Sequence, residues 1–209
     1  MTDTRTVKDV IVRAAAGDPD ALGELWRGHQ HLLLRYFRGK GMNEPEDLAS
    51  TVWVEVARGL STFDGDANEF RRWLFTIAAR RRIDEIRRDR RRRNRDEILQ
   101  SERQPGPAAG ADVVAERAAS LDRAIELVQG LPPDQAEAVL LRVVADLTVA
   151  DVALIMNRSE GSVRVLTHRG LKRLAERADS GGHGPANDDS DINSVIPVTD
   201  TDPKAMYAS

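Results

Sequence analysis

EFRRWLFTIAARRRIDEIRRDRRRRNR, residues 69–95, begins apolar and aromatic and ends almost wholly basic. It holds twelve arginines against three acids from Asp84 onwards, in a chain whose formal net charge is only −3. Planar, permanently charged guanidinium groups suit phosphates. A run made of arginine alone therefore favours a nucleic-acid partner over a merely solvated, salt-bridged helix end, which is the alternative interpretation.

Read as a helix at 100° per residue, this stretch has two apolar lines. The early line belongs in a core and consists of Phe70, Trp73, Leu74 and Ile77. The second line is expected to anchor the later half and consists of Phe75, Ala79, Ile83 and Ile86. The sector left open to a partner carries Arg80, Arg81, Arg87, Arg88 and Arg91. Phe70 and Trp73 could instead stack on bases, but their place on the early face favours the core.

Composition excludes several classes of protein. There is no cysteine among the 209 residues, so disulfides, thiolate metal sites and a cysteine nucleophile are excluded. No run approaches the roughly 18 apolar residues of a membrane span, and the first residues lack the apolar core of a signal peptide. His29 and His31 are two positions apart on one helix and do not face one metal. We expect a soluble, cytoplasmic protein without metal, cofactor or catalysis.

The order of helix signals predicts an all-α chain of two small domains. The first spans 1–93, with helices at 19–38, at 45–60 and from the loop 61–68 onwards. Asp18-Pro19 and Asn43-Glu44-Pro45 are helix starts, and Asp66 or Asn68 should cap the third helix. A flexible linker at 94–117 contains Pro105-Gly106-Pro107. The second domain spans 118–177, and the acidic stretch 178–209 is expected to be disordered.

The second domain contains a helix-turn-helix pattern. Thr148-x-x-Asp151 is a capping box for a short helix, Asn157-Arg158 is a turn, and Ser159 caps a longer helix. The outer face of that helix can donate to phosphates and read major-groove edges. Its candidate residues are Ser159, Glu160, Ser162, Arg164, Thr167, His168, Arg169, Lys172 and Arg173. An ordinary helical hairpin with a solvated basic side is the alternative for this segment.

Taken together, four stretches resemble a known family. They are PEDLASTVWVEV (45–56), FRRWLFTIAARRRIDEIRR (70–88), LPPDQAEAVLLRVVADLTVADVALIMN (131–157) and RSEGSVRVLTHRGLKRL (158–174). In this order and spacing, the chain resembles bacterial RNA polymerase sigma factors of the compact extracytoplasmic-function (ECF) group. The resemblance implies a region 2 module at 1–93 and a region 4 module at 118–177. Ser50-Thr51 and Ala79-Arg80 depart from residues that the family often has at these places.

The resemblance also implies partners and site residues. The partners are core RNA polymerase, through its clamp coiled coil and flap, and promoter DNA. Many members of the family also bind an anti-sigma factor. Polymerase contacts are implied for Asp47, Leu48, Trp53 and Glu55. Recognition and melting of the −10 element are implied for Asp64, Asn68, Arg80, Arg81, Asp84, Arg87 and Arg88. The helix 159–174 is implied to read the −35 element.

Three alternatives remain open at this point. The chain could be a homodimeric helix-turn-helix regulator that never docks on polymerase. It could be a magnesium-dependent nuclease that uses Glu46, Asp47 and Glu55. In addition, the tail, with six acids against one lysine, could fold back on the arginine-rich helix and suppress DNA binding. Assembly with core polymerase and promoter-specific transcription separate the first two from a sigma factor.

Overall fold

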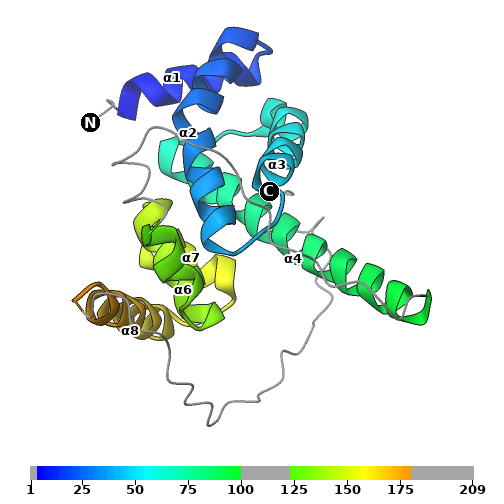
Figure 1. Ribbon diagram of the computed structural model, residues 1–209. Helices are drawn as coiled ribbons and strands as arrows, with labels where there is room; N and C mark the ends of the chain where they lie inside the picture. Colours follow the sequence, from blue (N-terminus) through cyan, green and yellow to red (C-terminus); the bar gives the residue numbers. More distant parts are fainter. Residues whose placement is uncertain (1–3, 100–122, 180–209) are drawn as a thin grey trace.

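The computed structural model describes residues 4–99 and 123–179, and every regular element in these ranges is helical (Figure 1). The N-terminal helices are α1 (Thr4–Ala15), α2 (Pro19–Gly39), α3 (Pro45–Gly59), the short η1 (Leu60–Thr62) and α4 (Ala67–Leu99). The C-terminal helices are a helical segment at 123–129, α6 (Pro133–Val139), η2 (Leu140–Val144), α7 (Val149–Met156) and α8 (Glu160–Asp179). The expected linker beyond 99 and the tail beyond 179 lie outside the described residues.

Capping chemistry positions the first two long helices. Asp18 Oδ1 accepts from the backbone N–H groups of Asp20 and Ala21, at 2.9 and 3.2 Å, and Pro19 follows as the first helical residue. α3 begins at Pro45 as predicted, but Glu44 makes no capping hydrogen bond through its side chain. The longer Glu side chain is a poor substitute for an Asp cap, so proline alone marks this start.

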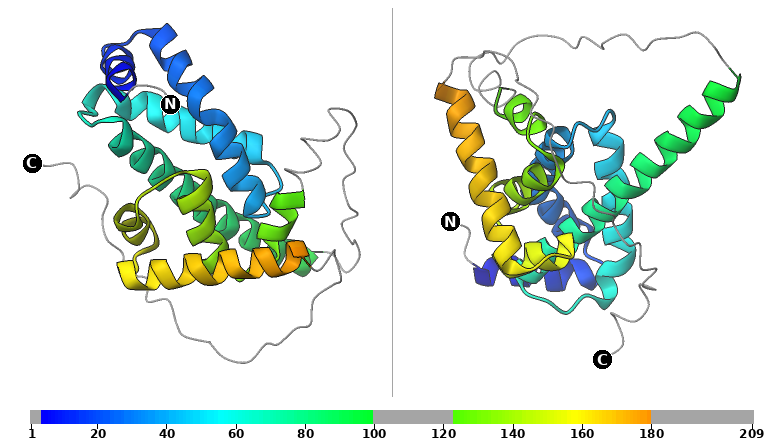
Figure 2. Two further views of the ribbon diagram at one scale, coloured as in Figure 1. Left: turned by 90° about the vertical axis from the view of Figure 1, so that its left-hand side faces the viewer. Right: turned by 90° about the horizontal axis from the view of Figure 1, so that it is seen from below.

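α4 is the longest element, about 50 Å at 1.5 Å per residue. Asp66 Oδ1 accepts from the N–H groups of Asn68 and Glu69, and Glu69 Oε2 accepts from Asp66 N at 2.8 Å, which completes a capping box. The helix continues to Leu99, past its expected end near Arg93, because no glycine or proline interrupts it there. Its C-terminal half projects away from the other helices (Figures 1 and 2).

The apolar spacing of Ala136, Val139, Leu140, Val143 and Leu147 predicts one amphipathic helix, but the structure has two elements there. α6 ends at Val139, and the backbone continues as the π-helix η2. The wider turn shifts the helical register, so Val143 is 58% exposed rather than facing the core as predicted. Asp146 then reverses the chain with a φ of 51°, one residue before the buried Leu147.

The helix-turn-helix forms as the sequence predicts. Thr148 and Asp151 make the capping box of α7, and Asn157 takes the left-handed conformation, with φ of 50°. Ser159 Oγ accepts from Ser162 N at 3.2 Å and starts α8. Gly170 lets α8 lie directly on α6, since a Cβ there would lie 2.6 Å from Val139 Cγ2.

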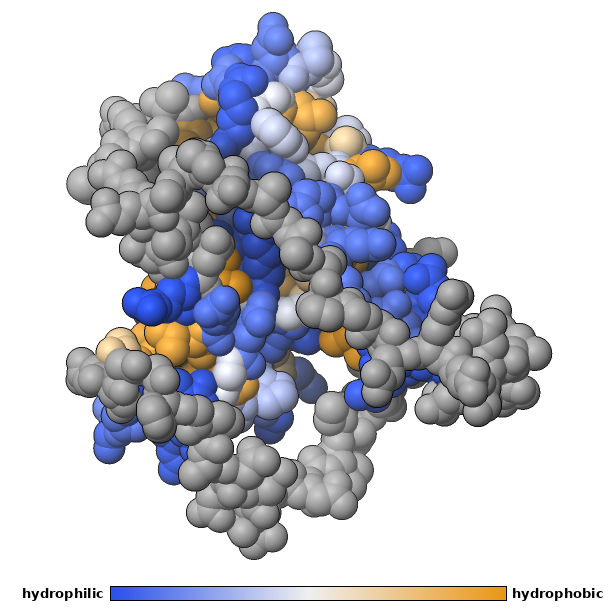
Figure 3. Space-filling model, viewed as in Figure 1, coloured by the Kyte–Doolittle hydropathy of each residue, from blue (hydrophilic) through white to orange (hydrophobic). Residues whose placement is uncertain are grey.

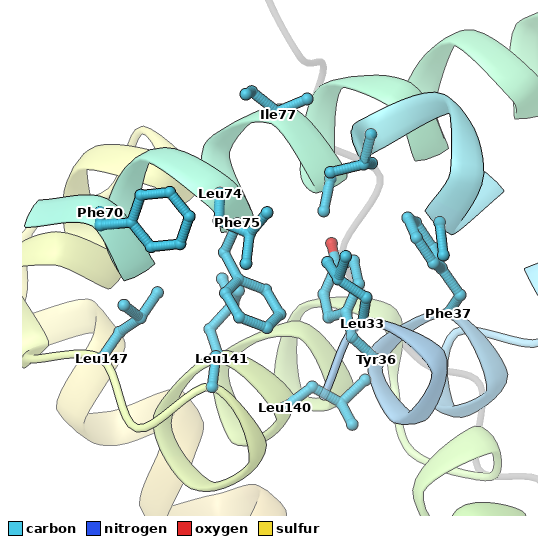
Figure 4. Packing of buried hydrophobic residues seen from close by; sticks show 14 of the residues in the cluster. Leu33, Tyr36, Phe37, Phe70, Leu74, Phe75, Ile77, Leu140, Leu141 and Leu147 are labelled. Carbon is cyan, nitrogen blue, oxygen red and sulfur yellow. The ribbon is translucent and has the colours of Figure 1, made fainter. Parts of the chain in front are cut away.

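A single core joins the N-terminal and C-terminal helices, where the sequence suggested two separate cores. Tyr36 of α2 and Phe75 of α4 are fully buried, with ring centroids 5.7 Å apart, and Leu140 and Leu141 of η2 belong to the same cluster (Figure 4). A Cβ on Gly39 would lie 2.7 Å from Leu140 Cδ2. The two halves therefore pack as one body.

The two apolar lines of α4 have different outcomes. Phe70, Leu74 and Ile77 of the early line are buried as predicted. The second line holds at Phe75 and Ala79 but fails further along, because Ile83 is 42% exposed where α4 leaves its neighbours.

Candidate nucleic-acid interface

The outer face of α8 carries most of the predicted recognition residues. Those fully on the surface are Ser159, Glu160, Arg164, His168, Arg169, Lys172 and Arg173, and Ser162 is half-buried. Thr167 is the exception, because its hydroxyl oxygen is buried. The residue as a whole is half-buried, like Ser162, so its contact with DNA stays a prediction. The remaining residues are exposed or half-exposed, and the apolar Val165 and Leu171 are exposed among them, at 48% and 44%.

Ion pairs within α8 hold two of these cations in place. Arg164 Nη2 lies 2.6 Å from Glu160 Oε2, one turn earlier, and Lys172 Nζ lies 3.8 Å from Glu176 Oε1. Both pairs are exposed, and exposed ion pairs contribute about 0–1 kcal/mol. Exchanging Glu160 for a phosphate or a base edge therefore costs Arg164 little.

The arginines at the middle of α4 are engaged by α3. The Glu55 carboxylate binds both Arg80 and Arg81, with Arg81 Nη2 2.6 Å from Oε2. Glu55 is thus a positioning group within the N-terminal half, where the sequence had suggested a polymerase contact. Further along, Arg87 is exposed, Arg88 pairs with Glu85 and Asp84 is half-buried.

A pocket lies beside the loop that precedes α4. It has a volume of about 320 Å³ and is lined by Glu55, Arg58, Gly59, Thr62, Trp73, Thr76, Ile77 and Arg80. Phe63 of the loop stacks on Trp73, with centroids 5.0 Å apart and planes 18° apart. Trp73 is therefore a pocket wall as well as a core-packing residue, whereas Phe70 is wholly buried. Asp64 lies exposed on the same loop, and Asn68 lies exposed in the first turn of α4.

On α3, the four residues proposed to meet polymerase do not share a surface. Asp47 is exposed, but Leu48 and Trp53 are 7% and 8% exposed. Trp53 Nε1 donates to Gln30 Oε1 at 2.8 Å, which ties it to α2. Leu48 and Trp53 are core residues, so the prediction of direct contacts from them is wrong in this arrangement. The exposed side of the helix instead presents Asp47 with Val54, a half-exposed residue that the sequence pattern did not single out.

The surface seen in Figure 3 is largely hydrophilic where residues are described, with small separate apolar areas. Among the described residues, no helix is long and apolar enough to cross a membrane. Within the same ranges, no three His, Asp or Glu side chains are grouped as a metal site. Glu55, one of the three acids considered as metal ligands, is instead paired with two arginines.

His29 gives the described part of the chain a pH dependence. Its ring is within hydrogen-bond distance of Leu25 O and meets Phe70 edge-on at 5.3 Å. Burial lowers the pKa of His29, and the nearby Arg71 charge lowers it further. The unfolded chain therefore binds more protons once pH falls below about 6.5. We expect the free energy of unfolding to fall as pH drops from 7.5 to 5.5.

Urea denaturation at the two pH values measures this loss. His29→Gln should flatten the profile, whereas His31→Gln should change it less, since His31 is exposed although burial also lowers its pKa. An unchanged profile in His29→Gln would contradict the assignment.

Comparison with known proteins agrees with this geometry. Residues 25–92 match the family model of sigma-70 region 2, and residues 121–174 match that of sigma-70 region 4. The ECF RNA polymerase sigma factor BldN of Streptomyces coelicolor is 32% identical over 183 residues, covering 83% of this chain and 66% of BldN. SigD of Mycobacterium tuberculosis is 30% identical, covering 83% of this chain and 84% of SigD.

Two solved structures share the fold. CnrH, in complex with the cytosolic domain of CnrY, has a TM-score of 0.58 at 19% identity, covering 84% of this chain and 98% of CnrH. RpoE of Bartonella quintana, in complex with the anti-sigma factor NepR, has a TM-score of 0.54 at 20% identity, covering 75% and 97%.

The chain belongs to the ECF group of the sigma-70 family. It is therefore a protein of the class that binds core RNA polymerase and directs initiation at specific promoters. The interpretation as a homodimeric regulator without polymerase docking is not favoured.

Proposed function

We propose that α8 reads the −35 element through the surface that begins at Ser159 and continues past Arg169. The observation that carries this assignment is the exposed, mostly polar face of α8, which points outward because Val163 is buried and Gly170 packs on α6. The first turns of a recognition helix meet base edges, and its later residues meet the backbone. Arg164 therefore serves as a base reader, and Arg169, Lys172 and Arg173 serve as phosphate contacts.

The loop 61–66 and the first half of α4 serve the −10 element. Extruding a base costs a few kcal/mol, which a single-stranded site must offset by stacking and phosphate contacts. The pocket beside Phe63 and Trp73 offers an aromatic wall, and the exposed Asp64 and Asn68 supply polar groups from the neighbouring part of the chain. Arg87 and Arg88 on the next turns supply charge for the DNA backbone, and Glu85 pairs with Arg88. Asp84 is a further polar group on this part of α4. Arg80 and Arg81 become available as phosphate contacts when Glu55 releases them.

Polymerase docking is assigned to the exposed side of α3. Asp47, Thr51 and Val54 follow one another at helical spacing and are all exposed, so they can meet a partner together. The protein acts in the cytoplasm, where its polymerase is, and has no catalysis of its own. An anti-sigma factor is a further partner, as it is for RpoE of Bartonella quintana.

Transcription in vitro tests the role of α8. The promoter is first identified by sequencing the 5′ ends of transcripts that core polymerase makes with this chain. On that promoter, Arg164→Ala should lower specific initiation about tenfold, since a base contact contributes about 1–3 kcal/mol. Arg123→Ala removes one exposed arginine elsewhere in the same half and should leave initiation nearly unchanged. Equal losses in the two variants would point to general electrostatics and against reading by α8.

A further inference from the structure

A buried charged cluster joins the two halves of the molecule through residues far apart in the sequence. Tyr36 of α2 donates its hydroxyl to Glu137 Oε1 of α6 at 2.6 Å. Glu137 Oε2 lies 3.0 Å from Lys40 Nζ and 3.1 Å from Arg82 Nη2 of α4. The Glu137 side chain is 9% exposed, and those of Lys40 and Arg82 are 7% and 16% exposed. We call Glu137 and these three partners the Glu137 cluster.

Other polar contacts cross the same interface. Arg71 Nη1 lies 3.1 Å from Asp146 Oδ2, and Arg72 Nη1 lies 3.4 Å from Asp151 Oδ1. Lys40 Nζ also donates to Pro133 O at 3.0 Å. Three arginines of α4 thus meet acids of the C-terminal half, on the helix whose cationic face serves promoter DNA.

The packed arrangement is too small to span a promoter. The −35 and −10 elements lie about 25 base pairs apart, or about 85 Å along straight DNA. A compact body of about 150 residues has a radius of gyration near 15 Å, and even its longest element, α4, measures only about 50 Å. α8 lies across the base of this body, where it packs on α6 and α7 of the same compact unit (Figure 2). The two halves must therefore separate before both elements can be bound.

We propose that this packing is a closed, self-inhibited state of the free sigma factor, and that Glu137 is the residue that holds it closed. The proposal rests on the function assigned above, because only a protein that must reach two separated elements is inhibited by compactness. Core polymerase and promoter DNA, which bind the separated halves, are the ligands that open it.

The chemistry of the cluster makes the contact strong yet reversible. Removing one partner of a buried ion pair is costly because it leaves the other charge uncompensated, whereas separating the whole cluster returns every group to water. Lys40 and Arg82 both depend on Glu137 in this way. Consistently, burial lowers the pKa of Lys40 even with the carboxylate beside it.

The first test compares two neutralised carboxylates in the full-length chain. Glu137→Gln keeps the shape of the side chain but leaves Lys40 and Arg82 without a counter-charge. It should shift the equilibrium towards the open form about 100-fold. Small-angle scattering of the free protein should show a larger radius of gyration, and binding to core polymerase should tighten. Glu126→Gln, an exposed change of equal charge in the same half, should change neither. Unchanged compactness and affinity in Glu137→Gln would overturn the proposal.

The second test locks the interface with a disulfide. A Cβ at Gly39 would lie 3.4 Å from Leu140 Cγ, so the Cβ atoms at the two positions lie within about 5 Å, close enough for a bond in the pair Gly39→Cys and Leu140→Cys. The natural chain has no cysteine to compete. Promoter-specific transcription should fall at least tenfold after oxidation and return with a reducing agent.

The outcomes distinguish a failure of the closed-state proposal from a failure of the proposed sigma-factor function. If the unmodified chain gave core polymerase no promoter activity, the assigned function would fail. If the oxidised pair transcribed as well as the reduced pair, or if no disulfide formed in the free chain, the closed state would be refuted. Single-cysteine variants control for oxidation, and Glu137→Gln decides the matter if the reduced pair does not fold.

Discussion

Phe75→Ala should lower the free energy of unfolding by about 3–5 kcal/mol, the usual cost of deleting a buried aromatic ring. Phe75 is fully buried at the centre of the shared core, where its ring meets Tyr36 edge-on at 5.7 Å (Figure 4). Because domains are stable by only about 5–15 kcal/mol, the change removes a large fraction of the total. Thermal unfolding followed by circular dichroism should show a midpoint lower by about 10 °C or more.

Ile83→Ala is the matched control, since both residues were predicted to lie on the same apolar line of α4. Ile83 is 42% exposed, so its truncation should change stability by no more than about 0.5 kcal/mol. Comparable losses at the two positions would mean that α4 is buried along its whole length, against the packing seen here.

Gly170→Ala should destabilise the helix-turn-helix by about 1–3 kcal/mol, although alanine favours a helix. The new Cβ would lie 2.6 Å from Val139 Cγ2 and 3.3 Å from Gln135 O. Val139 is buried and branched at Cβ, so it cannot turn away without disturbing α6. Promoter-specific transcription should fall with stability, because α8 is displaced from the surface that orients it.

Gly161→Ala provides the opposite expectation on the same helix. A Cβ there meets nothing within 4 Å, so the better helix propensity of alanine should stabilise the chain by up to about 1 kcal/mol. Urea denaturation of both variants gives the two free energies. A stabilised Gly170→Ala would show that α8 does not rest on α6 at this point.

Local chemistry determined the elements that sequence reasoning placed correctly. Asp18 with Pro19, Thr148 with Asp151, and Ser159 are caps whose partners lie within three residues, so their effect can be read directly from the sequence. The helix-turn-helix and the polar face of α8 follow from the same short-range rules. The family resemblance, now supported by matches to both sigma regions, added the partners.

Burial, by contrast, depends on what packs against a helix. Leu48 and Trp53 were assigned to a partner surface, yet both are buried, and Trp53 is hydrogen-bonded to α2. Ile83 was assigned to a core that α4 has already left. Thr167 is one helical turn from Arg164, but its hydroxyl oxygen is buried. The spacing of apolar residues shows which side of a helix is apolar, but not how far along the helix that side is buried. The buried length is set by the length of the neighbouring helices.

The basic helix at residues 69–95 shows both what the sequence determines and what tertiary packing determines. The sequence alone determined that it is helical, apolar at its start and arginine-rich beyond, because periodicity and charge are properties of the chain itself. Only the tertiary structure decided which of these arginines form ion pairs within the protein. Arg80 and Arg81 bind Glu55, Arg82 binds Glu137, and Arg87 stays exposed. Acids distant in the sequence make that choice, since an ion pair forms only where the folded chain brings two charges within a few ångströms.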